Sequence, residues 1–169
     1  AKGFTSNCLG SKEICDWLQA TLVPQGLEES VLYPRVCQLL SRKGYTTMQS
    51  FPHGRYSPFE VDILGYKRDS GELYMVEVKL CHINKALRQG MARLPYSDFV
   101  SLAFPEAYAQ YVSSKFRREL QEKGFGLISI DGTAKELISP RKSTRLKSLY
   151  KECIMRDVYR RFSIPYVMA

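Results

Sequence analysis

Residues 59–80, FEVDILGYKRDSGELYMVEVKL, are the stretch that decides the fold. Two runs rich in β-branched and aromatic residues flank an Asp-Ser-Gly turn signal, which predicts a β-hairpin with strands over 59–66 and 73–80. Side chains alternate between the two faces of a strand. In the second run both faces start apolar and charge appears only near the carboxyl end. The pattern predicts a central strand that is covered on both sides and ends at a cleft.

Three charged side chains of this hairpin are expected to converge. A turn centred on the Asp-Ser step sets Asp62 directly opposite Glu77, and Lys79 follows two residues later on the same face. Opposed Cβ atoms lie roughly 5 Å apart, where like charges are destabilising unless something lies between them. A divalent cation such as Mg²⁺, which prefers oxygen ligands, would fill that place. The alternative is a surface hairpin in which Glu60 pairs with Lys79 and both opposed acids are solvated.

The spacing of these residues resembles a known signature. Asp62, fourteen intervening residues and then Glu77-Val78-Lys79 are similar to the D…(D/E)xK pattern of the PD-(D/E)XK nuclease superfamily. The resemblance implies an α/β domain of the restriction-endonuclease-like fold, with a mixed β-sheet flanked by helices. It covers about residues 27–138 and neither end of the chain.

The resemblance also implies roles for the hairpin residues. Asp62 and Glu77 would hold Mg²⁺, with Mn²⁺ as a substitute, and the Val78 carbonyl would add a ligand. Lys79 would orient the nucleophilic water for attack on a phosphodiester. The implied activity is that of a metal-dependent nuclease acting on DNA.

Glu29 is expected to join this site. The stretch Glu-Ser-x-Leu-Tyr-Pro over 29–34 is similar to the opening of small uncharacterised members of the superfamily, whose corresponding acid belongs to the metal site. Proline is tolerated in the first turn of a helix and not in its interior, so Pro34 places the start of the regular helix near Tyr33. Glu29 then lies in a preceding turn. Alternatively, it is only an acidic residue that favours the helix dipole.

Gln89 is the last predicted catalytic residue. The helix after the hairpin has an apolar stripe of Ile83, Leu87, Met91 and Leu94, and Gln89 and Arg93 lie one turn apart on another stripe. Small neighbours would let this stripe approach the sheet closely. By resemblance Gln89 positions substrate or solvent, whereas taken alone it is an ordinary polar helix residue.

The two ends of the chain extend the predicted core. We expect a single domain over 1–169, with a helical extension over 1–26 and a basic helical extension over 140–169. The latter contains eight Lys and Arg residues and two acids, so it holds six of the eight net positive charges of the chain. Basic surfaces gain affinity for nucleic acid by releasing counterions from phosphates. The residues expected to contact nucleic acid are Arg55, Lys85, Arg88, Arg93, Arg141, Lys142, Arg145 and Lys147.

Composition limits the other classes of function. Five cysteines without a CxxC argue against a disulfide framework or a structural zinc and favour buried thiols in a reducing cytoplasm. No apolar run is long enough for a membrane span. Two alternatives to a nuclease stay open: a noncatalytic DNA-binding or assembly module on the same fold, and a domain whose basic helix binds an acidic protein. A homodimer would suit double-strand cleavage by a domain with one site.

Overall fold

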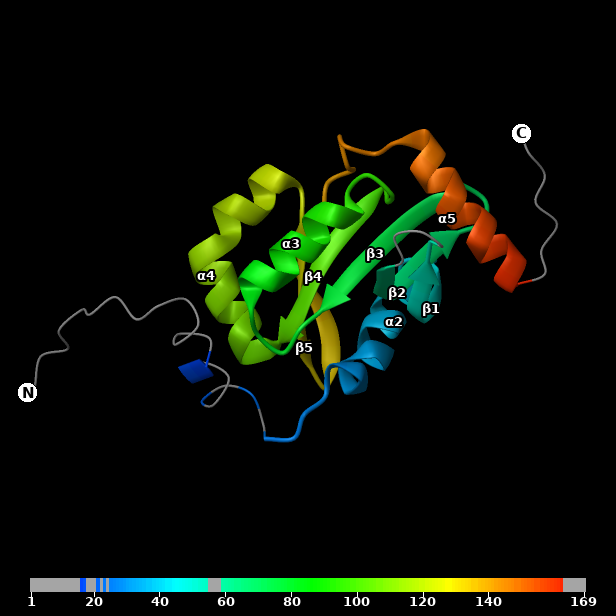
Figure 1. Ribbon diagram of the computed structural model, residues 1–169. Helices are drawn as coiled ribbons and strands as arrows, with labels where there is room; N and C mark the ends of the chain where they lie inside the picture. Colours follow the sequence, from blue (N-terminus) through cyan, green and yellow to red (C-terminus); the bar gives the residue numbers. More distant parts are fainter. Residues whose placement is uncertain (1–15, 18–20, 22, 24, 55–58, 163–169) are drawn as a thin grey trace, which may run out of the picture.

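A six-stranded mixed sheet forms the centre of the part of the chain that the computed structural model describes, residues 16–17, 21, 23, 25–54 and 59–162 (Figure 1). Strand order follows the sequence: β3 pairs parallel with β4 and β4 with β5, while the other neighbours are antiparallel. The strands are β1 (Thr46–His53), β2 (Phe59–Lys67), β3 (Glu72–Val78), β4 (Phe99–Pro105), β5 (Gly126–Asp131) and β6 (Thr133–Ile138).

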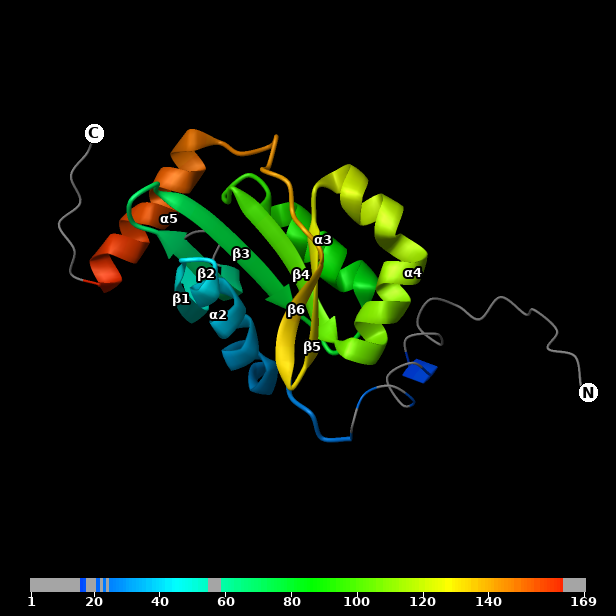
Figure 2. The same ribbon diagram turned by 180° about the vertical axis from the view of Figure 1, so that it is seen from behind.

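Helices cover both faces of this sheet, as Figures 1 and 2 show from opposite sides. They are η1 (Glu29–Leu32), α2 (Tyr33–Arg42), α3 (Ile83–Arg93), α4 (Glu106–Lys123) and α5 (Ser148–Arg161). One apolar cluster joins α2 to one face of the sheet. On the opposite face, a second cluster contains residues of α3 and α4, and a third contains residues of α5. The expected α/β architecture, a mixed sheet flanked by helices, is therefore confirmed.

The hairpin of β2 and β3 has the predicted register. Its paired residues run from Lys67 opposite Glu72 to Ile63 opposite Val76. Continuing this register by one step sets Asp62 opposite Glu77. The faces of β3 also alternate as expected: its even-numbered residues pack under α2, whereas its first odd-numbered residues pack under α5. β3 is a central strand, buried on both sides.

Strand β1 was not predicted from the sequence. It pairs with β2 along its length, and His53 lies opposite Phe59. As an edge strand β1 is largely polar and half exposed, and it contains Pro52, which strands tolerate mainly at an edge. Ser50 has a φ of 48°, so the strand is also irregular. These features hide the alternation of side chains that marks a strand.

The basic C-terminal helix is shorter than predicted. Residues 140–147 are not helical, because backbone N–H groups there bond to distant carbonyls: Ser143 to Asp98 at 2.7 Å and Lys147 to Pro95 at 2.9 Å. Those contacts hold the segment against the sheet, and α5 begins at Ser148. Residues 163–169 and most of the expected N-terminal extension lie outside the described residues.

Candidate active site

Strands β2 and β3 stop pairing where the predicted site lies. Beyond the Ile63–Val76 pair, side chains take over the backbone hydrogen bonds. The Val78 N–H donates to Asp62 Oδ2 at 2.8 Å, and Arg93 Nη2 donates to the Glu60 carbonyl at 3.0 Å. The end of the ladder therefore opens a place between the strands that charged groups fill.

Lys79 is the centre of an ion cluster at this place. Its Nζ donates to Glu29 Oε2 at 3.1 Å, to Asp62 Oδ2 at 3.2 Å and to the Val78 carbonyl at 2.7 Å, and its side chain is only 6% exposed. Tyr33 completes the cluster by donating its hydroxyl to Asp62 Oδ1 at 3.0 Å. Residues far apart in the sequence thus meet at the end of β3.

Glu29 reaches this cluster because of the local structure around Pro34. The 3₁₀ turn η1 carries Glu29, and α2 starts at Tyr33 with the proline in its first turn, as predicted. The same junction places the Tyr33 ring under the sheet and its hydroxyl beside Asp62. One turn of irregular helix therefore supplies two of the polar groups of the site.

The electrostatics keep Lys79 charged and Tyr33 neutral. Burial lowers the pKa of Lys79, but the carboxylates of Asp62 and Glu29 outweigh burial and raise it above its ordinary value. The pKa of Tyr33 is raised by burial and then by the charge of Asp62. At neutral pH the cluster therefore offers an ammonium and a hydroxyl as donors around the Asp62 carboxylate.

Glu77 is the most perturbed acid of the site. It is 1% exposed, and Arg93 Nε donates to its Oε1 at 2.7 Å. Its pKa is raised to about 7, mainly by burial; the charge of Asp62 adds to the rise, whereas Arg93 and Lys79 lower the pKa. Because the charge of Asp62 acts on Glu77, the two opposed carboxylates share one electrostatic environment, as the hairpin register predicted.

Arg93 is the site residue that sequence reasoning misassigned. We expected it to contact nucleic acid, but it is buried between the Glu77 carboxylate, the Glu60 carbonyl and the ring of Phe59, whose centroid lies 4.2 Å from the guanidinium carbon. That surface role is therefore wrong. The available signal was the position of Arg93 one turn after Gln89, on the stripe that was expected to face the sheet.

Gln89 has an unsatisfied acceptor. Its Oε1 is buried and accepts no hydrogen bond from any described residue. A buried carbonyl without a partner costs about 1–3 kcal/mol, so such groups in native proteins call for an explanation. Gln89 lies one helical turn before Arg93 on α3. The structure does not join it to Lys79 or Asp62 by a hydrogen bond.

The oxygen donors of the site suit a hard divalent cation. Mg²⁺ is commonly bound through one or two carboxylates, with waters and substrate phosphates completing its shell. Asp62, Glu77 and the Val78 carbonyl are such a set, and the raised pKa of Glu77 shows a carboxylate whose charge is not fully compensated. No group of three or more His, Cys, Asp or Glu side chains suited to a metal occurs in the described part. Each acid of the pair already contacts a cation, Lys79 or Arg93.

Most of the predicted nucleic-acid contacts lie on the surface. Lys85 and Arg88 are exposed on α3, whereas Arg55 lies outside the described residues. The exposed basic residues of the segment that leads into α5 are Arg141, Lys142, Arg145 and Lys147. The thiol predictions are met in part, since Cys81 is buried but Cys153 is exposed.

Comparison with known proteins supports the fold and leaves the activity open. No protein-family model matches the chain, and no curated protein matches it. Its structure is similar to that of a protein of unknown function from Silicibacter pomeroyi, with 17% sequence identity and a TM-score of 0.56 over 82% of this chain and 88% of that one. In the described residues, no helix combines the length and apolar character needed to cross a bilayer.

Proposed function

We propose that this protein is a Mg²⁺-dependent nuclease that hydrolyses phosphodiester bonds in DNA. The observation that carries the proposal is the convergence of Glu29, Asp62 and Lys79 at the end of β3, with the buried Glu77 beside them. Buried ionisable groups with perturbed pKa values and specific charge partners are typical of functional sites. A net charge of +8 favours a polyanionic substrate.

The proposed reaction needs a nucleophile and a means of stabilising charge. Water adds through its oxygen to phosphorus, one P–O ester bond breaks, and the products are a phosphate monoester and a hydroxyl group. A Mg²⁺ held by Asp62, Glu77 and the Val78 carbonyl would supply Lewis-acid activation of the water and charge neutralisation at the phosphate.

The residues of the chain have distinct parts in this reaction. The three donor hydrogens of Lys79 meet Glu29, Asp62 and the Val78 carbonyl, so Lys79 would exchange one of these contacts to orient the attacking water. Its charge would stabilise the negative charge that develops on the phosphoryl oxygens. Glu29 and Asp62 hold its ammonium in place from two sides. Tyr33 fixes the orientation of the Asp62 carboxylate through a hydrogen bond. The unpaired Gln89 carbonyl is an acceptor available to substrate or solvent.

One observation favours a second function. The buried ion pair of Glu77 with Arg93 gives this acid a resident cation, as expected of a noncatalytic DNA-binding module on the same fold. Such a module would bind DNA in a salt-sensitive and metal-independent way, and Glu77→Ala would leave the affinity unchanged.

A cleavage assay separates the two functions. The protein is incubated with single-stranded, duplex, flapped and branched DNA and with RNA, in Mg²⁺, Mn²⁺ or EDTA. We expect metal-dependent cleavage of DNA that Asp62→Asn and Lys79→Met strongly reduce, while Lys115→Met, at an exposed lysine on α4, retains it. Cleavage that survives EDTA or both substitutions would refute the mechanism, and binding without cleavage in either metal would favour the noncatalytic module.

A further inference from the structure

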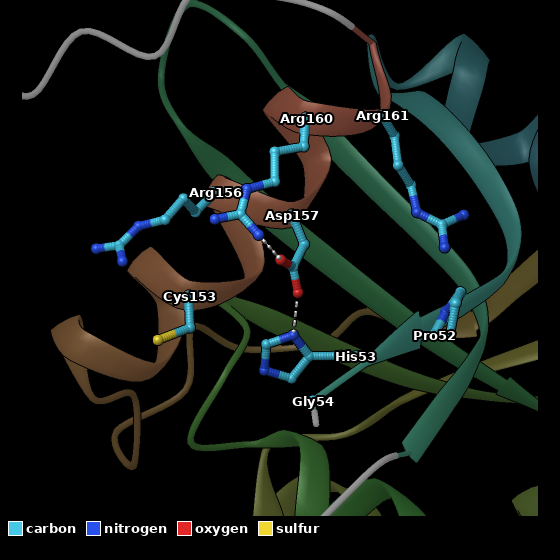
Figure 3. Close-up of a pocket in the computed structure, with 8 residues that line it drawn as sticks. All are labelled: Pro52, His53, Gly54, Cys153, Arg156, Asp157, Arg160 and Arg161. Carbon is cyan, nitrogen blue, oxygen red and sulfur yellow. Dashed lines mark hydrogen bonds and ion pairs between the residues drawn. The ribbon is translucent and has the colours of Figure 1, made fainter. Parts of the chain in front are cut away.

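A basic hollow lies between α5 and the end of β1, away from the ion cluster. It has a volume of about 530 Å³ and is lined by Arg156, Asp157, Arg160 and Arg161 of α5 and by His53 of β1, among others. Figure 3 shows His53 pointing toward Asp157, with Arg156 and Arg161 on opposite sides of this pair. The hollow was not expected from the sequence, because no strand was predicted at β1.

The charges of this hollow are not balanced. Its acid, Asp157, accepts a hydrogen bond from His53 Nδ1 at 2.7 Å and lies 3.9 Å from Arg160 Nη1. Arg161 stacks on the Phe51 ring at 4.9 Å, and Arg156 forms no ion pair with any described residue. Three arginines against one occupied carboxylate leave a surplus of two positive charges around an open space.

The hollow is connected to the candidate active site through an aromatic side chain. The ring of Phe59 lies 5.2 Å from the ring of His53 and 4.2 Å from the guanidinium of Arg93, which binds Glu77. Phe59 is also three residues before Asp62 on β2, a separation of roughly 10 Å at about 3.3 Å per residue. The hollow and the acids therefore lie along one short stretch of β2.

We infer that this hollow binds a backbone phosphate of the nucleic-acid strand whose scissile bond lies at Asp62 and Glu77. The inference rests on the proposed function. Arginine forms paired, charge-assisted hydrogen bonds with phosphate oxygens, and three arginines that share one carboxylate around a hollow are suited to that ligand.

Binding measurements in EDTA test the hollow without cleavage. The affinity of a fluorescent single-stranded or duplex oligonucleotide is measured by anisotropy over a range of KCl concentrations. The variants are Arg156→Gln/Arg160→Gln and a matched control on α4, Arg117→Gln/Arg118→Gln, which removes two equally exposed arginines. We expect the first to bind about tenfold or more weakly and to lower the slope of log affinity against log salt by about 1 per lost contact. The control stays within about twofold, since it removes only distant charge.

Two further arms establish that phosphate is the ligand. Inorganic phosphate should displace the oligonucleotide from the unmodified protein more effectively than chloride at equal ionic strength, and this excess should vanish in Arg156→Gln/Arg160→Gln. The variant Arg156→Lys/Arg160→Lys keeps both charges and should restore the salt slope, which excludes misfolding as the cause. Circular dichroism melts check the fold of every variant.

The outcomes distinguish this inference from the proposed nuclease. Equal effects of the α5 and α4 pairs, no effect of either, or binding to anionic lipid vesicles in place of DNA would overturn the hollow as a phosphate site. Cleavage that depends on Asp62 and Lys79 would still stand in the first two cases. Conversely, DNA binding that depends on the arginines of the hollow, without cleavage in Mg²⁺ or Mn²⁺, would support the hollow as a phosphate site and reject the nuclease.

Discussion

Buried acids lie beside both ends of strand β3, but in different surroundings. At its start Asp98 is 1% exposed, accepts the Leu73 N–H at 2.9 Å and contacts Lys151 at 2.7 Å and Lys142 at 3.6 Å. At its end three acids and two cations crowd together, the pKa of Glu77 is raised, and a nearby carbonyl has no partner. The acid at the first end has its hydrogen-bond and ion-pair partners, whereas the second end keeps a polar atom without a partner.

The difference separates charges that stabilise the fold from charges that the fold keeps in place for a function. Asp98 ties the C-terminal segment to the sheet, because Lys142 precedes α5 and Lys151 lies on it. Its contacts satisfy the acid, as is usual for a structural ion cluster. Around Lys79, ion-paired groups lie near a buried acid with a raised pKa and a carbonyl without a partner. Such groups cost stability and are typical of functional sites.

The largest expected effect is loss of activity on removing the Lys79 ammonium. If the end of β3 is catalytic, Lys79→Met should lower kcat/KM for DNA cleavage by about 10²–10³-fold, because a preorganised charge at the developing phosphoryl charge is lost. Steady-state cleavage in Mg²⁺ measures it, with Lys151→Met at the other end as the matched lysine control. Similar losses for both lysines would abolish the distinction between the two ends.

At the start of β3 the expected effect is on stability. Asp98→Ala leaves the Leu73 N–H unsatisfied and two lysines without their acid, and it should lower the free energy of unfolding by about 3 kcal/mol. Asp98→Asn keeps an acceptor for the N–H and should lose less. Urea denaturation measures both variants. Cleavage per folded molecule should be unchanged, and a catalytic defect that exceeds the folding defect would contradict the structural assignment.

Glu77 gives the comparison a dependence on pH. Its pKa of about 7 lies above the ordinary value of 4.5, so the folded state favours its protonated form. Its contribution to stability is present below pH 4.5 and is lost as the pH rises to 7, a change of roughly 3 kcal/mol. Urea denaturation in EDTA at a series of pH values should show this decline relative to Glu77→Gln. Parallel curves for the two proteins would mean that folding does not change the pKa of Glu77.

Gln89 tests whether imbalance at the site costs stability. Replacing it with leucine removes the unpaired carbonyl, so the free energy of unfolding should rise by about 1 kcal/mol while cleavage falls about tenfold. Opposite signs in the two measurements are the signature of a functional group. A Gln89→Leu variant that loses both stability and activity would instead show that the amide has a structural role.

The smallest expected effect is at the exposed lysine beside Asp98. The Lys142 side chain is 68% exposed, and its contact with Asp98 is long at 3.6 Å, so Lys142→Gln should change the free energy of unfolding by less than about 1 kcal/mol. Lys151→Gln, which removes the shorter and more buried contact, should cost more. Thermal melts of the two variants rank them, and the reverse order would show that the long contact dominates.

The sequence predicted the parts of the site that depend on local rules. Strand alternation and the turn signal were sufficient for the register that opposes Asp62 and Glu77, and the proline rule placed Glu29 in a turn before α2. Arg93 could not be placed in this way, because its burial depends on how α3 packs against the sheet. β1 was missed because an irregular polar edge strand lacks the pattern of a buried one, and the hollow beside it was missed with it.

The parallel pairing of β3 with β4 also bears on the order of folding. The β2–β3 hairpin has a short turn, and hairpins close within about 1–10 μs, whereas a parallel neighbour requires a longer crossover, here through α3. We therefore expect Asp62 and Glu77 to meet before Arg93 reaches them. The combined negative charge of the two carboxylates attracts the guanidinium of Arg93. Because salt screens this attraction, docking of α3 should become slower as ionic strength rises. The two carboxylates that form the site would then also guide α3, the helix that carries Arg93, onto the sheet.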